Sequence, residues 1–197
     1  MKTNATGKQK STNILKARPT IVQPLCCVIK AGTSNGILLE YADYGPVQHY
    51  LRKLTTQLPE VAVILRWASQ AAQAIVFLHA NGVMHGDITY NNFFLDKNLD
   101  LKVGDFTNLK ILSSLGDISN LKMEVFEFGL ALYEMSTGIE LYHGQSPEEK
   151  KEALRLNGFP DLSQVKRLGS VISQCWNSEF HTITDILRGI CEVCDWT

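Results

Sequence analysis

The chain has 197 residues, of which 45% are hydrophobic, so it is long enough to bury the core of one globular domain. Its 19 Lys and Arg residues nearly balance its 20 Asp and Glu residues, and this balance gives no reason to expect nucleic acid or an anionic membrane as a partner. The apolar runs are shorter than a membrane span, and the N-terminus lacks the apolar segment of a signal peptide. Five cysteines, an odd number without framework spacing, indicate an intracellular, reducing compartment: the cytoplasm, with the nucleus also compatible.

From the N-terminus, residues 1–20 form a polar leader that is predicted to be disordered. Further along, residues 64–78 carry apolar side chains at helical spacing, and Asn81-Gly82 follows as a stop signal. The sequence therefore predicts a long helix whose apolar face consists of Ile64, Trp67, Ala68, Ala71, Ala72, Ile75 and Leu78.

Residues 85–92 read His-Gly-Asp-Ile-Thr-Tyr-Asn-Asn, and Asp105 follows after two short apolar runs. These runs, residues 93–95 and 99–103, are predicted as two strands joined by a tight turn. A hairpin of this kind would place Asn92 and Asp105 at neighbouring strand ends.

Carboxylate and amide oxygens at this spacing suit a phosphoryl-transfer site. Such a site needs Mg²⁺ held by hard oxygen ligands and an acceptor hydroxyl positioned by a carboxylate. Asp87, Asn92 and Asp105 are the candidates for these roles. Isolated Asp and Asn residues more often cap loops or form turns, but three of them on one hairpin favour the site.

The pattern His-x-Asp-x-x-x-x-Asn followed by Asp-Phe resembles the catalytic loop and the metal-binding motif of the eukaryotic protein kinase family. The resemblance implies that Asp87 is the catalytic base, that Asn92 and Asp105 are Mg²⁺ ligands, and that His85 packs the loop. Residues 85–92 are called the catalytic loop below.

The resemblance covers most of the chain, from about residue 21 to residue 193. Residues 36–45 resemble the last strand of the kinase N-lobe, running into the hinge segment (residues 40–45). The hinge implies Mg-ATP as the cofactor. The residues implied to bind it are Leu39, at the gatekeeper position, and Glu40, Tyr41 and Ala42, whose backbone would face the adenine.

Downstream, residues 124–138 resemble the central buried helix of the kinase C-lobe, and two later segments, residues 168–176 and 182–193, resemble its last helices. The expected fold is therefore α+β, a protein kinase-like fold with a mostly helical C-lobe and a remnant N-lobe sheet. The expected divisions are the leader (1–20), the N-lobe strands with the hinge (21–45) and the C-lobe (46–195).

Two smaller patterns complete the C-terminal half. Ser146 followed by Pro147 predicts a helix that opens with a capping serine and a proline in its first turn. Cys191 and Cys194 have Cys-x-x-Cys spacing without a second pair, so we expect them on successive turns of the last helix with no metal or redox role.

Several positions depart from the kinase pattern. The sequence contains no Gly-x-Gly-x-x-Gly loop and no Val-Ala-x-Lys, and so lacks the phosphate-pairing lysine. Gly86, Thr89 and Thr107 replace the usual Arg, Lys and Gly, and residues 107–123 are short for an activation loop and contain no Ala-Pro-Glu. In these reductions the chain resembles short, reduced protein kinase-like proteins of filamentous fungi.

The expected function is ATP- and Mg²⁺-dependent phosphoryl transfer to protein hydroxyls, serine or threonine rather than tyrosine, at a rate impaired by the absent lysine. The catalytic loop also resembles that of aminoglycoside and choline phosphotransferases, but the hinge and the helix at 124–138 favour the protein kinases. The alternative is an inactive pseudokinase that binds a partner kinase or its substrate through surfaces near Leu38, Tyr41 and Leu95, or through an open strand edge at 26–29. A decayed paralogue or an incomplete gene model is a third interpretation.

Overall fold

The computed structural model of the chain describes residues 20, 24–31, 34–54, 57–112 and 118–194. The predicted leader lies outside these residues except for Thr20, whose carbonyl oxygen accepts a hydrogen bond from the Val103 amide at 2.9 Å. The division of the chain at residues 21, 46 and 195 stays a prediction.

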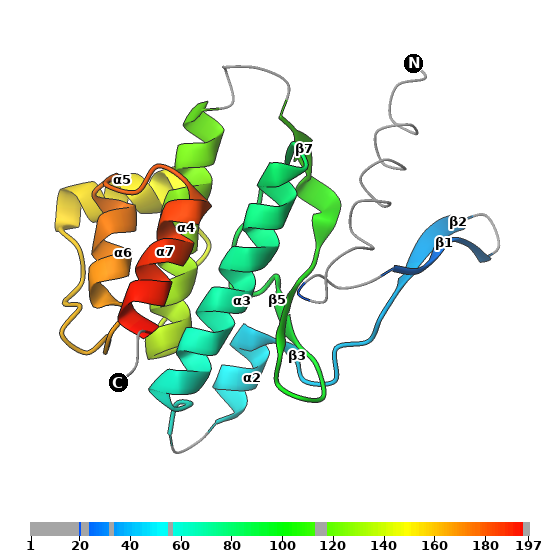
Figure 1. The fold of residues 1–197 in the computed structure, drawn as a ribbon, viewed down its shortest axis with the longest axis horizontal. Helices are drawn as coiled ribbons and strands as arrows, with labels where there is room; N and C mark the ends of the chain where they lie inside the picture. Colours follow the sequence, from blue (N-terminus) through cyan, green and yellow to red (C-terminus); the bar gives the residue numbers. More distant parts are fainter. Residues whose placement is uncertain (1–19, 21–23, 32–33, 55–56, 113–117, 195–197) are drawn as a thin grey trace.

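The strands form three small antiparallel sheets. Strands β1 (Pro24–Ala31) and β2 (Ser34–Leu39) pair as a hairpin, which stands away from the helices in Figure 1. Strands β3 (Gly45–Pro46), β5 (Phe93–Leu95) and β6 (Leu101–Val103) form a sheet in the order β3-β5-β6. The short strands β4 (Val83–Met84) and β7 (Lys110–Ile111) pair with each other.

The hairpin predicted after the catalytic loop is confirmed. Phe93 pairs with Val103 and Leu95 pairs with Leu101, and side chains alternate between buried and half-buried along both strands. The second strand begins at Leu101, later than predicted, because Leu99 has a φ of 59° and belongs to the turn.

Helices make up the rest of the fold and lie together on one side of the molecule (Figure 1). Apart from the short helix α2, they match the segments predicted above, although the central helix begins at residue 118, earlier than expected. Their bounds are α2 Val47–Lys53, α3 Val61–Ala80, α4 Ile118–Thr137, α5 Pro147–Asn157, α6 Gly169–Trp176 and α7 Ile183–Cys194. Cys191 and Cys194 both fall in α7, as predicted.

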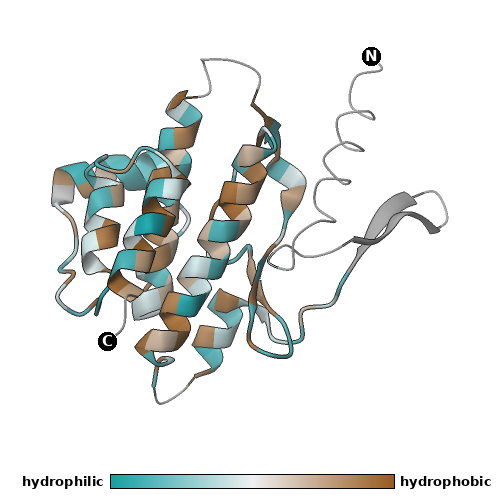
Figure 2. Cartoon of the chain, in the orientation of Figure 1, coloured by the Kyte–Doolittle hydropathy of each residue, from teal (hydrophilic) through white to brown (hydrophobic). Residues whose placement is uncertain are grey.

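The core is built around α3 and α4. Helix α3 packs against α7 and β6, and α4 packs against α6. Apolar residues recur along the whole of α3 in Figure 2, whereas α5 at the edge of the molecule is largely hydrophilic. Every residue of α4 from Glu124 to Met135 is buried, which is the pattern of a helix surrounded by protein on all sides.

Helix α3 is long and apolar enough to cross a membrane by length and composition alone. Half of its apolar window is buried inside the fold, as in the core helix of a globular domain, so this test is weak evidence for a membrane span.

The start of α5 has the predicted cap. The Ser146 hydroxyl accepts a hydrogen bond from the Glu149 amide at 3.2 Å, and the Glu149 carboxylate accepts one from the Ser146 amide at 2.7 Å. This reciprocal pair satisfies two backbone donors that would otherwise lack partners at the helix end.

We predict that Gly129→Ala destabilises the protein, because α4 and α6 touch at Gly129. An added Cβ would lie 2.7 Å from Cys175 Cβ and 3.0 Å from Trp176 Nε1. Overpacking of this kind costs about 1–3 kcal/mol, whereas alanine at an exposed helix position would gain up to about 1 kcal/mol. Chemical denaturation measures the change, and an unchanged or raised stability would contradict the close contact.

Candidate active site

His85 fixes the start of the catalytic loop. Its side chain is fully buried, and its Nε2 lies 2.9 Å from the carbonyl oxygen of Gly104, the residue before Asp105. Burial lowers the pKa of this imidazole, so the neutral ring donates to that carbonyl. The ring also packs against Phe106, with 5.5 Å between centroids. His85 therefore has the packing role that the sequence predicted.

Asp87 and Asn92 are brought together inside the loop. The Asn92 amide nitrogen donates to the Asp87 backbone oxygen at 2.9 Å and to its carboxylate at 3.1 Å. Asn92 is buried and Asp87 is half-buried. These bonds use the nitrogen of the Asn92 side chain and leave its oxygen without a hydrogen-bond partner in the described part of the chain.

Asp105 is exposed and has a left-handed backbone, with φ 55° and ψ 71°, a conformation that Asp tolerates better than most residues. One of its carboxylate oxygens accepts from the Thr107 hydroxyl at 2.8 Å and from the Thr107 amide at 3.4 Å. A glycine at position 107 could not form the hydroxyl bond. The second Asp105 oxygen accepts no hydrogen bond from the residues that the structure describes.

The hairpin places these groups at neighbouring strand ends, as predicted. The Gly104 amide donates to the Asn92 carbonyl at 2.9 Å, so Asp105 follows directly on a residue bonded to Asn92. The open oxygens of Asn92 and Asp105 are hard ligands of the kind that Mg²⁺ prefers. No three His, Cys, Asp or Glu side chains form a metal site in the part of the chain that the structure describes, so a cation here depends on the Asn92 amide.

Glu124 of α4 accepts a hydrogen bond from the backbone of the catalytic loop. It is 2% exposed; one carboxylate oxygen accepts from the Gly86 amide at 2.7 Å, and the other lies 2.5 Å from His79 Nε2 at the end of α3. Gly86 has a φ of 79°, and a Cβ on it would overlap the carbonyl oxygen of Asn108. The arginine expected at position 86 therefore does not fit this loop.

Glu127, one turn further along α4, also faces the loop. It is 6% exposed, and its carboxylate accepts a single, long hydrogen bond of 3.3 Å from the Ile88 amide. Burial raises the pKa of Glu127 to about 8, and the neighbouring Glu124 carboxylate adds to the increase. The sequence analysis missed Glu124 and Glu127 as site residues. The available signal was two acids in an apolar helix, since glutamate is seldom buried without a partner.

A cavity of about 380 Å³ opens beside the hinge segment, a volume at the lower end for small-molecule sites. Phe94 of β5 and Asp105 line it together with the predicted ATP-binding residues Glu40, Tyr41 and Ala42. Leu39 ends β2, and its side chain lies outside what the structure describes, so its predicted role stays a prediction. Among the described residues, the lining comprises Glu40, Tyr41, Ala42, Asp43, Tyr44, Gly45, His49, Lys53, Phe94, Gly104 and Asp105.

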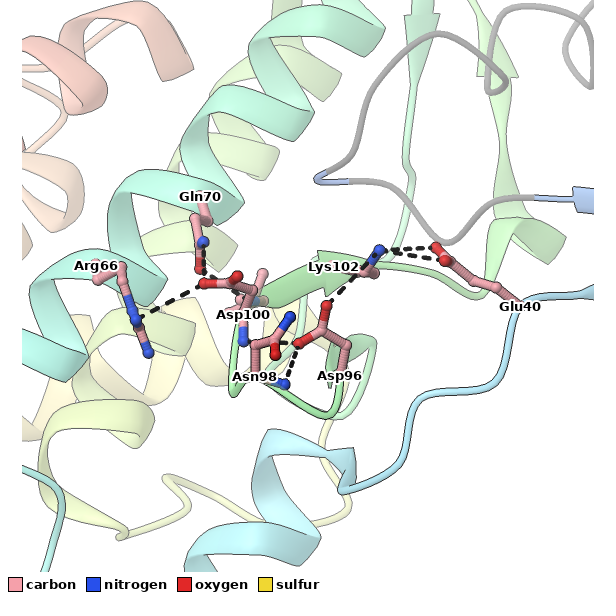
Figure 3. A network of polar contacts seen from close by, with 8 residues as sticks. Glu40, Arg66, Gln70, Asp96, Asn98, Asp100 and Lys102 are labelled. Atoms are coloured by element: carbon pink, nitrogen blue, oxygen red, sulfur yellow. Dashed lines mark hydrogen bonds and ion pairs between the residues drawn. The ribbon is translucent and has the colours of Figure 1, made fainter.

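A polar network ties the hinge to the hairpin, as Figure 3 shows. Lys102 of β6 lies 3.1 and 3.2 Å from the two carboxylate oxygens of Glu40 and 3.9 Å from Asp96 in the hairpin turn. On the other side of the turn, Gln70 of α3 donates to Asp100 at 2.9 Å. The wall of the cavity at Glu40 is thereby fixed to the C-terminal part of the fold.

One surface expected under the pseudokinase alternative is absent. Leu95 is fully buried, because β3 pairs with β5 at this position, with Gly45 opposite Leu95, and the prediction of an exposed apolar face near Leu95 is wrong. Tyr41, by contrast, is 82% exposed. The side chain of Leu38 lies outside what the structure describes.

Comparison with known proteins agrees with this arrangement. Residues 8–124 match the family described as protein tyrosine and serine/threonine kinase. The chain is 26% identical to a protein of Dictyostelium discoideum named as a probable serine/threonine-protein kinase, over 91% of this chain and 14% of that protein. It is 26% identical to a serine/threonine/tyrosine-protein kinase of Arabidopsis thaliana, over 81% of this chain and 46% of the relative. Integrin-linked protein kinase 1 of Arabidopsis thaliana is 26% identical over 73% of this chain and 37% of the relative.

A fold with a mostly helical lobe beside small antiparallel sheets, and a loop that pairs Asp87 with Asn92, define a protein kinase-like domain. The chain belongs to the protein tyrosine and serine/threonine kinase family. It spans less than half the length of each of these three relatives.

We predict that Glu127→Gln changes how stability depends on pH. A glutamate with a folded-state pKa of about 8, above its usual value near 4.3, contributes stability that is complete at low pH and is lost as pH rises through 8. Burial raises the pKa of Glu134 to about 7. Its contribution to stability is therefore lost in the same way as pH rises through 7. Between pH 7 and 8, Glu127 is therefore the main contributor of the two.

Across that interval the free energy of unfolding of the native protein should fall by up to about 1.4 kcal/mol relative to Glu127→Gln. Denaturation curves at pH 5, 7 and 8 measure the difference, with the exposed Glu179→Gln as the matched control. Parallel pH profiles for the native protein and Glu127→Gln would contradict the burial of a neutral Glu127.

Proposed function

We propose that this domain binds Mg-ATP in the hinge cavity and transfers its terminal phosphoryl group to a serine or threonine hydroxyl of a protein substrate. The observation that carries the proposal is that Asp105 lines the same cavity as Glu40, Tyr41 and Ala42 and follows directly on a residue bonded to Asn92. Nucleotide and metal groups are thus expected in one continuous site.

The hinge end of the cavity suits a flat, polar ring. Glu40, Tyr41 and Ala42 line this end, where the kinase resemblance implies that their backbone faces the adenine, and Phe94 also lines it with an aromatic side chain. Aromatic side chains stack on flat rings with offset geometry. The ion pair between Lys102 and Glu40 keeps this wall in place before a ligand arrives, which lowers the entropy lost on binding.

At the other end, the open oxygens of Asn92 and Asp105 would hold Mg²⁺. Bound there, the ion would neutralise charge on the phosphate oxygens. Asp87 carries the remaining role: its half-buried carboxylate, fixed by the Asn92 amide, would orient the acceptor hydroxyl and take its proton. The hydrogen bond from the Gly86 amide to Glu124 fixes the backbone next to Asp87 and therefore the position of its carboxylate.

The composition of the same site favours a low rate of phosphoryl transfer. The sequence contains no Val-Ala-x-Lys, and removal of one group that stabilises transition-state charge typically costs about 3–4 kcal/mol. The Thr107 hydroxyl also occupies one oxygen of Asp105. This bond favours the second candidate function, a pseudokinase that binds a protein partner without transferring phosphate.

The test is Mg-ATP binding to the purified chain by calorimetry, with the shift in melting temperature as a second readout. Ligand that binds only the folded state raises stability by RT ln(1 + [L]/Kd), so even millimolar affinity is detectable at high nucleotide concentration. We expect binding that requires Mg²⁺ and is lost in Asp105→Ala. Folded protein that binds no nucleotide would overturn the proposal.

Asp87→Asn separates binding from transfer. It should keep Mg-ATP binding and abolish phosphorylation of a generic protein substrate, which the native chain should perform more slowly than the roughly 1–100 per second of typical kinases. Binding without any transfer in the native chain would favour the pseudokinase.

A further inference from the structure

Helix α2 carries pairs of side chains that are four residues apart and have different surroundings. Residues at this spacing lie on the same face of a helix. Val47 and Leu51 form a buried pair in the core. Gln48 and Arg52 form a second pair, and both donate to the Glu140 carboxylate, each at 3.1 Å. These two faces fix the rotation of α2 about its own axis.

The third pair, His49 and Lys53, lines the hinge cavity. Both side chains are exposed, and neither forms a hydrogen bond or an ion pair with another residue that the structure describes. Lys53 is also the last residue of α2, where the helix dipole favours a positive charge. The packing of the other two faces therefore brings an uncompensated ammonium group to the cavity.

The charges that line the cavity differ in how they are compensated. Lys53 is the only lysine or arginine among the described lining residues, whereas Glu40, Asp43 and Asp105 are acidic. Glu40 is paired with Lys102, and Asp105 is the expected Mg²⁺ ligand. A ligand in the cavity therefore meets one ammonium group and one carboxylate, that of Asp43, without an ion-pair partner among the described residues.

Building on the proposed function, we propose that Lys53 binds a phosphate group of the nucleotide, with His49 as a second donor to the same ligand. The sequence contains no Val-Ala-x-Lys, so the phosphates need positive charge from another group. A lysine ammonium is a point charge on a flexible stem and a common partner of phosphate. Lys53 lines the cavity together with Asp105, so its charge and the expected Mg²⁺ would act on one ligand.

Asp43 provides a change of opposite sign. Its carboxylate lines the same cavity and repels a phosphate. Removal of this charge should therefore strengthen the binding of a phosphorylated ligand, whereas removal of the Lys53 charge should weaken it. Opposite effects of two exposed residues distinguish a contact with phosphate from a general loss of structure.

The experiment measures by calorimetry the affinity of the full chain for Mg-ATP and, by displacement of Mg-ATP, for adenosine. The two ligands share a base and a ribose, so the ratio of their affinities isolates the contribution of the phosphates. Lys53→Gln should lower this ratio about fivefold, as for a partly exposed ion pair, and Lys53→Arg should retain most of it. Asp43→Asn should raise the ratio. Lys97→Gln removes an equal charge from the exposed hairpin turn and should leave the ratio unchanged.

His49→Gln should lower the ratio by less than Lys53→Gln, because the imidazole donates a hydrogen bond but does not replace the ammonium charge. AMP and ADP then locate the contact. The effect of Lys53→Gln should appear when one particular phosphate is added and should persist in the longer nucleotides. A loss of equal size for adenosine and for all three nucleotides would contradict a phosphate contact.

The two proposals fail in different ways. If Mg-ATP binds but Lys53→Gln leaves the ratio unchanged, the role of Lys53 is overturned and the proposed nucleotide site remains. If folded protein binds neither Mg-ATP nor adenosine, both proposals are overturned. Because Lys53 is exposed, its substitution should leave the melting temperature without ligand unchanged, and this measurement accompanies each titration.

Ionic strength gives a second readout. Salt screens interactions between exposed charges, so the affinity for Mg-ATP should fall more steeply with added salt in the native protein than in Lys53→Gln. Lys97→Gln should keep the native slope. Equal slopes for the native protein and Lys53→Gln would contradict a contact between the Lys53 ammonium and a phosphate.

Discussion

The hydrogen bond from the Gly86 amide to the Glu124 carboxylate is the interaction on which the site depends. Glu124 lies in α4, the most deeply buried helix, and also contacts His79 at the end of α3. The catalytic loop is thereby attached to both central helices. Because Asp87 follows Gly86, the position of the expected catalytic base is set by a carboxylate that is only 2% exposed. Charge-assisted bonds of this kind are shorter and stronger than neutral ones.

This attachment explains how the chain accommodates its departures from the kinase pattern. Gly86 adopts a left-handed backbone with no room for a side chain, so the loop is held by its backbone and not by the arginine that kinases carry there. This arrangement places two acidic side chains of α4, Glu124 and Glu127, beside the loop, and Glu127 accepts one hydrogen bond from the described residues.

Local sequence patterns predicted most of the fold. Helical spacing located α3, the Ser146 cap located α5, and the hairpin after the catalytic loop placed Asn92 and Asp105 at neighbouring strand ends. Contacts between distant residues were not predictable in this way: the ion pair of Lys102 with Glu40 joins residues that only the folded chain brings together. The burial of Leu95 depends likewise on pairing with the distant β3, and neither Glu124 nor Glu127 has a local motif.

Amide hydrogen exchange across the catalytic loop tests the central claim most directly. If Glu124 holds the loop, the Gly86 amide should exchange far more slowly in the native protein than the amide of Lys97 in the exposed hairpin turn, which donates no hydrogen bond among the described residues. In a folded Glu124→Ala variant that protection should be lost while the protection of α3 is retained. A Gly86 amide that exchanges as fast as the exposed turn in the native protein, or that stays protected in the variant, would contradict the account.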